Sequence, residues 1–204
     1  PIASSAASDV YKRQVAMRVA TRSTRRIAEL IPGQVPLDPV VLGTFDNILI
    51  ATDDIFQQTG FIEALRGWLL KGGQLWLMLD KVSPDVAQQI LGDCIALEHV
   101  DDTSMNSFTL SSLNDLINAE SELFFEDPVT QRRVLIDGGE VEMEIEGWPA
   151  LFWLPYGRGK IMVTTLEARG LVRKFGKQDV VVGMAGRGSV NELQRQLFQS
   201  DFVF

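Results

Sequence analysis

Cysteine and histidine, the side chains that most often supply a nucleophile or a general base, are almost absent from this sequence. The 204 residues contain one cysteine, Cys94, and one histidine, His99. A single cysteine excludes an intrachain disulfide, and one cysteine with one histidine cannot supply the four ligands of a structural zinc site. Cys94 follows a helix-ending Gly92 and His99 lies in an expected strand, so we interpret both as ordinary side chains rather than a catalytic pair.

Positive charge is also scarce. The chain has 19 lysines and arginines against 27 aspartates and glutamates, which gives a formal net charge of −8. Binding to DNA or RNA needs clustered basic residues, and the segment 18–26 is the one local exception, so we expect no nucleic-acid partner. The apolar runs are far shorter than the roughly 20 residues that span a bilayer, so we expect no membrane span within this fragment.

Cofactor motifs are weak as well. The segment 183–189 is rich in glycine but lacks the Lys-Ser or Lys-Thr ending of a phosphate-binding loop. We therefore expect a turn there, with no cofactor and no metal ion.

The two ends of the chain differ in character from its middle. Residues 1–14 have no hydrophobic period, and residues 9–14 resemble the translated end of a transposon used to prepare sequencing libraries. We expect 1–14 to be a non-native leader, 15–175 to form one α/β domain, and 176–204 to be a truncated C-terminal extension. The parent protein is then longer, and the fragment is expected to be the extracytoplasmic part of a bacterial membrane protein.

The front half reads as alternating strands and helices. Continuous apolar runs at 47–52 and 74–79 are typical of buried parallel strands. A helix is expected between them, ending at Lys71-Gly72-Gly73, because glycine accepts the left-handed conformation of a helix end. Ser83-Pro84-Asp85 predicts the start of a second helix. Strand, helix, strand, helix with short connections predicts a parallel sheet covered on both faces.

The back half reads as antiparallel strands. Residues 133–136 and 141–145, joined by Asp137-Gly138-Gly139, predict one hairpin, and residues 150–154 and 160–164 predict another. The whole pattern predicts an α/β fold with a mainly parallel sheet and added antiparallel hairpins.

Several of these segments, taken in order, resemble the core of class I glutamine amidotransferase-like domains. The resemblance spans roughly residues 40–170 and is similar to the non-catalytic versions found in large bacterial membrane proteins. It implies a flavodoxin-like three-layer sandwich. The segments that carry it are Phe45-Asp46 before a strand, the helix with Ala64–Trp68, Lys71-Gly72-Gly73, Pro149, Tyr156–Lys160 and Ile161–Thr165.

The resemblance also implies where catalytic groups would lie. An active member needs a cysteine on the sharp turn after the second strand, commonly with a small neighbour. That turn reads Leu79-Asp80-Lys81 here. The histidine position after the last hairpin reads Thr165, followed two residues later by Glu167, and threonine cannot accept a proton near neutral pH. We therefore expect a pseudoenzyme with no catalytic residues.

Acidic residues follow each expected parallel strand. Open α/β sheets bind ligands at the carboxyl ends of their strands, so Asp53 with Asp54, Asp80 with Lys81, and Glu167 could line one pocket. Carboxylates there could bind a cation or a sugar, although we favour solvated loop acids.

The resulting hypothesis is a non-catalytic domain that acts as an interaction or ligand-sensing module of a larger bacterial protein. Its partners would be other domains or subunits of a membrane-associated complex. The alternatives are a hydrolase that uses carboxylates such as Asp80 and Glu167, and a carbohydrate-binding domain.

Overall fold

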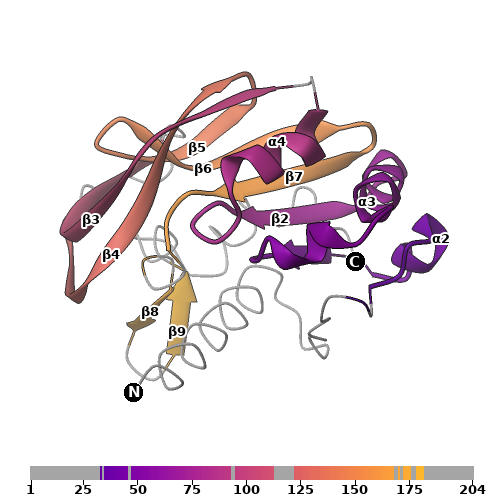
Figure 1. Ribbon diagram of the computed structural model, residues 1–204. Helices are drawn as coiled ribbons and strands as arrows, with labels where there is room; N and C mark the ends of the chain where they lie inside the picture. The colour runs from indigo at the N-terminus through magenta and orange to yellow at the C-terminus, as the bar shows by residue number, and fades with distance from the viewer. Residues whose placement is uncertain are drawn as a thin grey trace.

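The computed structural model describes residues 33, 35–45, 47–92, 95–112, 122–167, 170, 172–175 and 178–181. These residues form an α/β structure built on a mixed sheet, with a long two-stranded ribbon to one side and helices near the other (Figure 1). The segments 15–31 and 183–189 and Cys94 lie outside the described residues, as do the short helices that the sequence predicts at 113–119 and 190–197.

The described strands β1 to β7 form one seven-stranded sheet in the order β1-β2-β7-β6-β5-β3-β4. Short elements precede and follow it: α2 (Pro39–Leu42), the 3-10 helix η1 (Asp54–Gln57), and the separate pair β8 (Val172–Phe175) with β9 (Gln178–Val181). The strands of the main sheet are β1 (Asn47–Ile50), β2 (Gln74–Met78), β3 (Ala96–Ser112), β4 (Glu122–Asp137), β5 (Glu140–Ile145), β6 (Trp148–Tyr156) and β7 (Gly159–Thr164).

The expectation of a mainly parallel sheet is wrong. The pairs β1–β2 and β2–β7 are parallel, whereas β7–β6, β6–β5, β5–β3 and β3–β4 are antiparallel. The reason is that a parallel pair needs a crossover connection, and the sequence supplies helical crossovers only in its front half. The α/β fold class itself is confirmed.

The helices α3 and α4 were both predicted correctly. Helix α3 (Phe61–Leu70) ends at Lys71, and Gly72 then adopts a φ of +116°, which glycine reaches without steric cost. Helix α4 (Pro84–Leu91) begins with proline at its first position, where no backbone donor is lost. Apolar residues of both helices pack in the same core as Leu75 and Leu77 of β2. Within the described residues, α3 and α4 thus cover one face of the sheet rather than two.

The alternation of side chains along β2 separates two apolar cores. Leu75 and Leu77 point into the core beneath α3 and α4, because successive side chains of a strand face opposite ways. Trp76 and Met78 point into a second core, which includes Phe108 and Leu123 of the β3–β4 ribbon.

The back half pairs differently from the prediction. The sequence also predicts two short strands at 95–100 and 108–110. The structure has the single strand β3 there, which pairs with β4 along most of its length and with β5 at its end. The predicted hairpin across Asp137-Gly138-Gly139 is wrong, since β5 pairs with β6 instead of β4. The β5–β6 hairpin turns at Glu146 and Gly147, both with positive φ, as a two-residue hairpin turn requires. The predicted β6–β7 hairpin is confirmed.

The outer edge of β4 is tied back to the segment that follows β7. Gln131 forms an isolated antiparallel bridge with Leu166. The amide of Arg132 donates to the carbonyl of Thr165 at 3.0 Å, and the amide of Glu167 donates to the carbonyl of Thr130 at 2.9 Å. The ribbon therefore meets the sheet beside the carboxyl end of β7.

Candidate functional site at the carboxyl ends of the parallel strands

The carboxyl ends of the parallel strands meet at one edge of the sheet, where the sequence predicted a pocket. The amide of Leu79, just after β2, donates to the carbonyl of Thr164, the last residue of β7, at 2.8 Å. The residues after β2, 79–83, form a loop that leads into α4. We call residues 79–83 the strand-end loop.

Asp53 supports this loop from the β1 side. Its Oδ1 accepts a hydrogen bond from the amide of Ser83 at 2.9 Å. Ser83 is the N-cap residue of α4 and makes no capping bond with its own side chain, so a carboxylate from 30 positions earlier satisfies the amide there. The next acid, Asp54, has an Oδ2 that lies 3.2 Å from the hydroxyl of Thr52. Both acids are thus engaged in local structure.

Asp80 and Lys81 lie in the loop itself. The side chain of Asp80 is 2% exposed and that of Lys81 is 35% exposed, and the Lys81 Nζ lies 3.9 Å from the Asp80 Oδ2. A carboxylate buried to this degree requires a compensating charge or hydrogen bonds, and Lys81 supplies one such charge at the protein surface.

Glu167 is hydrogen-bonded to the ribbon. Its Oε2 accepts from the amide of Thr130 on β4 at 3.3 Å, and the residue is buried. Thr165, at the position implied for a catalytic base, is fully buried, and its hydroxyl donates to the carbonyl of Pro149 at 2.8 Å. Of the predicted pocket residues, Asp53, Asp80 and Lys81 therefore lie at the strand-end loop, and Glu167 bonds to β4.

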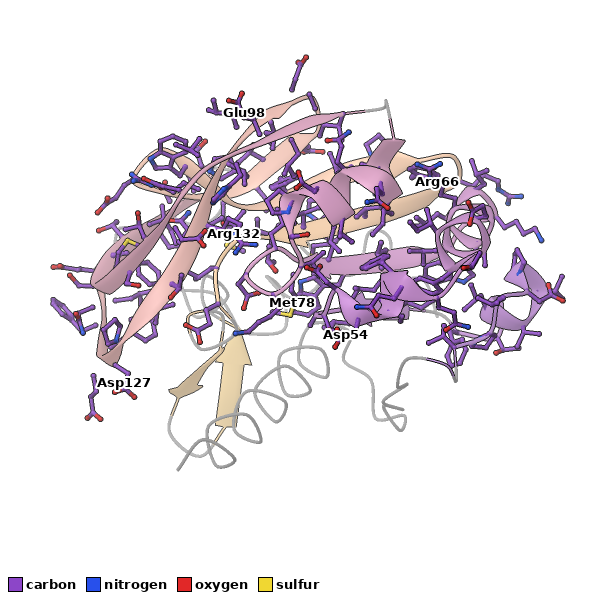
Figure 2. All side chains as sticks on the ribbon, in the orientation of Figure 1. Asp54, Arg66, Met78, Glu98, Asp127 and Arg132 are labelled. Atoms are coloured by element: carbon purple, nitrogen blue, oxygen red, sulfur yellow. The ribbon has the colours of Figure 1, made fainter. Side chains whose placement is uncertain are left out.

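The residue that joins these two groups is Arg132, which the sequence reading did not select. Its Nη1 donates to the carbonyls of Leu79 at 2.6 Å and Val82 at 3.0 Å. Figure 2 shows Arg132 between the ribbon and the loop after β2. Its own backbone amide bonds to Thr165, so one residue contacts both positions where the family resemblance implied catalytic groups.

Asp102 on β3 holds the guanidinium of Arg132 in place. Its two carboxylate oxygens accept from Nε at 2.9 Å and Nη2 at 3.2 Å, a bidentate arrangement. The hydrogen bond from Arg132 keeps the pKa of Asp102 below its usual range, and the hydrogen bond from His99 acts in the same direction. The His99 Nε2 lies 3.1 Å from the Asp102 Oδ1 on the exposed face of the ribbon.

A second arginine–aspartate pair lies one position along the same strands. Arg133 pairs with Asp101, and its Cζ lies 5.1 Å from the ring centroid of Trp148. The hydrogen bond with Arg133 keeps the pKa of Asp101 low, and the same contact raises that of Arg133. The hydrogen bonds between Arg133 and Asp101 lie within the ribbon, whereas those of Arg132 also reach the strand-end loop.

The chemistry available at this edge is limited in the part of the chain that the structure describes. No group of three or more His, Cys, Asp or Glu side chains there could hold a metal ion. None of the helices in that part is long and apolar enough to cross a membrane. The arrangement of Arg132 favours a structural use of the site, because its guanidinium bonds to backbone carbonyls and to Asp102.

Two signals in the sequence pointed toward Arg132. Arg132-Arg133 is a doubled basic pair in an acidic chain, and Asp101-Asp102 is a doubled acidic pair on an expected strand. Matching doubled charges on two strands favours cross-strand pairing. The target of Arg132, a loop about fifty positions earlier, had no signal in the sequence.

No protein-family model matches this chain, and no curated protein matches its sequence. Among solved structures, it is similar to the cytoplasmic protein STM1381 from Salmonella typhimurium LT2, with 14% identity and a TM-score of 0.53 over 73% of this chain and 74% of that one. It is also similar to a ThuA-like protein from Parabacteroides merdae ATCC 43184, with 9% identity and a TM-score of 0.51 over 95% of this chain and 85% of that one.

The exo-beta-1,4-mannosidase Op5Man5 from Opitutaceae bacterium strain TAV5 is 18% identical, with a TM-score of 0.48. The similarity covers 77% of this chain but 26% of the mannosidase. Likenesses at these identities concern the fold alone, and this third one is too loose to support an argument. The chain thus shares its α/β fold with STM1381 and the ThuA-like protein.

Proposed function

We propose that this chain is a non-catalytic domain of the glutamine amidotransferase-like type, with a flavodoxin-like arrangement, that serves as an interaction or ligand-sensing module of a larger bacterial protein. The observation that carries the proposal is the bonding of Arg132. Its side chain bonds to Leu79 in the turn where a nucleophile would lie, and its amide bonds to Thr165, where a base would lie. These structural hydrogen bonds support a non-catalytic role, because acyl transfer uses donors that are aimed at a developing oxyanion.

The carboxylate-hydrolase alternative has less support. A pair of acids works as general acid and base when both reach one substrate. Asp80 is nearly buried beside Lys81, and Glu167 accepts a hydrogen bond from Thr130 of β4, so both carboxylates have structural contacts. The carbohydrate-binding alternative has no contact in the described residues that favours it.

Turnover measurements test the catalytic half of the proposal. The purified chain is incubated with glutamine, and separately with a chromogenic ester and a chromogenic glycoside. We expect rates equal to those of buffer. Glutamine hydrolysis above background would overturn the proposal, and ester or glycoside turnover that falls in both Asp80→Asn and Glu167→Gln would establish the hydrolase instead.

The module half of the proposal is tested with the complete gene. We expect its reading frame to encode further domains, and the purified parent protein to show protection of this domain from limited proteolysis relative to the isolated chain. A complete reading frame that encodes this domain alone would contradict the proposal.

A further inference from the structure

The strand-end loop is held from three directions, and two of these contacts are made by backbone amides of the loop. The amide of Leu79 bonds to Thr164 of β7, and that of Ser83 bonds to Asp53 after β1. The amides of Lys81 and Val82 bond to the carbonyl of Met78 at 3.1 Å and 3.0 Å. The third direction is the ribbon, and there the tie runs to carbonyls rather than to amides.

Arg132 makes that third tie. Its Nη1 donates hydrogen bonds to the carbonyls of Leu79 and Val82. These two residues are fully buried and lie on either side of Asp80 and Lys81. Hydrogen bonds from a charged donor are roughly twice as strong as neutral ones, and a buried carbonyl left without a donor carries a desolvation cost. The loop is therefore most stable in its closed form while Arg132 is in place.

The ribbon has an attachment of its own that does not depend on Arg132. Gln88 of α4 donates to the carbonyl of Ile95 at 2.8 Å and accepts from the amide of Leu97 at 3.1 Å, at the start of β3. Loss of the arginine would consequently release the loop while the base of the ribbon stays on α4.

We propose that Arg132, oriented by Asp102, is a conformational latch that keeps the strand-end loop closed over Asp80. Release of the latch opens residues 79–83 and exposes the Asp80 carboxylate, without unfolding the sheet. Because coupling between two sites is reciprocal, a ligand or partner that displaces Asp102 from Arg132 on the ribbon opens the loop. This inference does not depend on the absence of catalysis.

Amide hydrogen exchange followed by NMR tests the latch. In Arg132→Gln, we expect the amides of Lys81, Val82 and Ser83 to exchange at least tenfold faster than in the unchanged protein. Amides of Leu75 and Leu77 inside β2 report the opening of the whole sheet, and they should change much less. A similar acceleration at β2 and at the loop would overturn the latch, since the variant would then act through global stability.

Arg133→Gln is the matched control. It removes an adjacent arginine of β4 that also pairs with an aspartate of β3, and it should leave exchange at residues 81–83 unchanged. Equal effects of the two arginine variants would contradict the proposal.

Carbodiimide labelling of carboxylates, read by mass spectrometry, gives a second measurement. Asp80 should react slowly in the unchanged protein and in Arg133→Gln, and several-fold faster in Arg132→Gln. Asp102→Asn keeps the arginine but removes its charged partner, so Asp80 should be labelled at an intermediate rate. This variant tests the latch even if Arg132→Gln fails to fold. Unchanged labelling of Asp80 in every variant would overturn the latch.

Discussion

The two ends of the parallel strands are built in opposite ways. At the amino ends, the start of β2 and the β6–β7 turn lie so close that Gly73 and Gly159 leave no room for a side chain: a Cβ on Gly73 would meet the Trp68 ring, and one on Gly159 would meet the carbonyl of Gly73. The amide of Lys160 donates to that carbonyl at 3.2 Å. At the carboxyl ends, one charged side chain from a distant strand fills the space.

The difference separates fold from function. The glycine segments that carried the family resemblance lie at the amino ends, where they make close backbone contacts. Ligands of open α/β sheets bind at the other end, and there Leu79, Thr165 and Arg132 are arranged around structural hydrogen bonds. One fold can carry different sites, so the packing at the amino ends does not determine the chemistry at the carboxyl ends.

The largest expected effect is at the amino ends. Gly159→Ala would force a methyl group against the carbonyls of Gly73 and Leu69, which are backbone atoms that cannot rotate away. We expect a loss of about 3 kcal/mol in the free energy of unfolding, measured by urea denaturation. Gly67→Ala is the control, because its methyl would meet the side chain of Pro39 at 3.1 Å within a helix, and we expect a change below about 1 kcal/mol. Equal losses would show that the close approach is not what requires glycine.

Arg132→Lys should have the next largest effect, at the carboxyl ends. Lysine carries a point charge without the planar fork that reaches Asp102 and two carbonyls together. We expect a loss of about 1 to 2 kcal/mol, from the partly buried hydrogen bonds that remain unmade. Arg133→Lys, at the more exposed neighbouring pair, should cost less. If the two substitutions cost the same by urea denaturation, the contacts of Arg132 to the loop contribute nothing measurable.

The amino-end region could be predicted from sequence because its determinants are local. Gly72 and Gly73 follow α3 directly, and Tyr156–Lys160 is a self-contained turn. The strands β1 and β2 and the helices α3 and α4 were predicted for the same reason, since an apolar run with a nearby helix end is visible within a short window.

The carboxyl-end region could not be predicted in the same way. The contact between Arg132 and Leu79 spans about fifty residues, and it depends on β4 turning back toward the segment after β7. The sequence analysis placed a hairpin at Asp137-Gly138-Gly139 and did not identify the turn at Glu146-Gly147. The expected hairpin put β4 beside β5, whereas β4 pairs with β3. Local turn chemistry decides where a chain reverses, while strand partners are set by long-range packing.

Acid should weaken the carboxyl-end region before the amino-end region. The folded pKa of Asp102 lies below that of an unfolded aspartate, about 3.9, because Arg132 bonds to its charged form. Its contribution to stability is therefore complete above that pH and is lost as the pH falls through the lower folded value. In Asp102→Asn, we expect the free energy of unfolding to fall less on acidification than in the unchanged protein. The difference should be a fraction of a kcal/mol, since the side chain is partly exposed to screening solvent. An unchanged acid limb in urea titrations between pH 5 and 2.5 would contradict this role.

The smallest expected effect is that of Glu167→Gln, and its smallness distinguishes a structural acid from a catalytic one. The glutamine carbonyl can still accept the hydrogen bond that the Thr130 amide gives to Oε2, so we expect stability within roughly 0.5 kcal/mol of the unchanged protein. Glu167→Ala removes the acceptor and leaves a part-buried amide without it, so it should cost about 1 kcal/mol. If Glu167 were catalytic, both variants would lose turnover. The loss would then be similar in the two variants, although only glutamine retains the hydrogen bond to Thr130. Urea denaturation and the ester assay, run on the same two variants, separate these patterns, because a carboxylate that acts as a hydrogen-bond acceptor for β4 can be replaced by an isosteric acceptor.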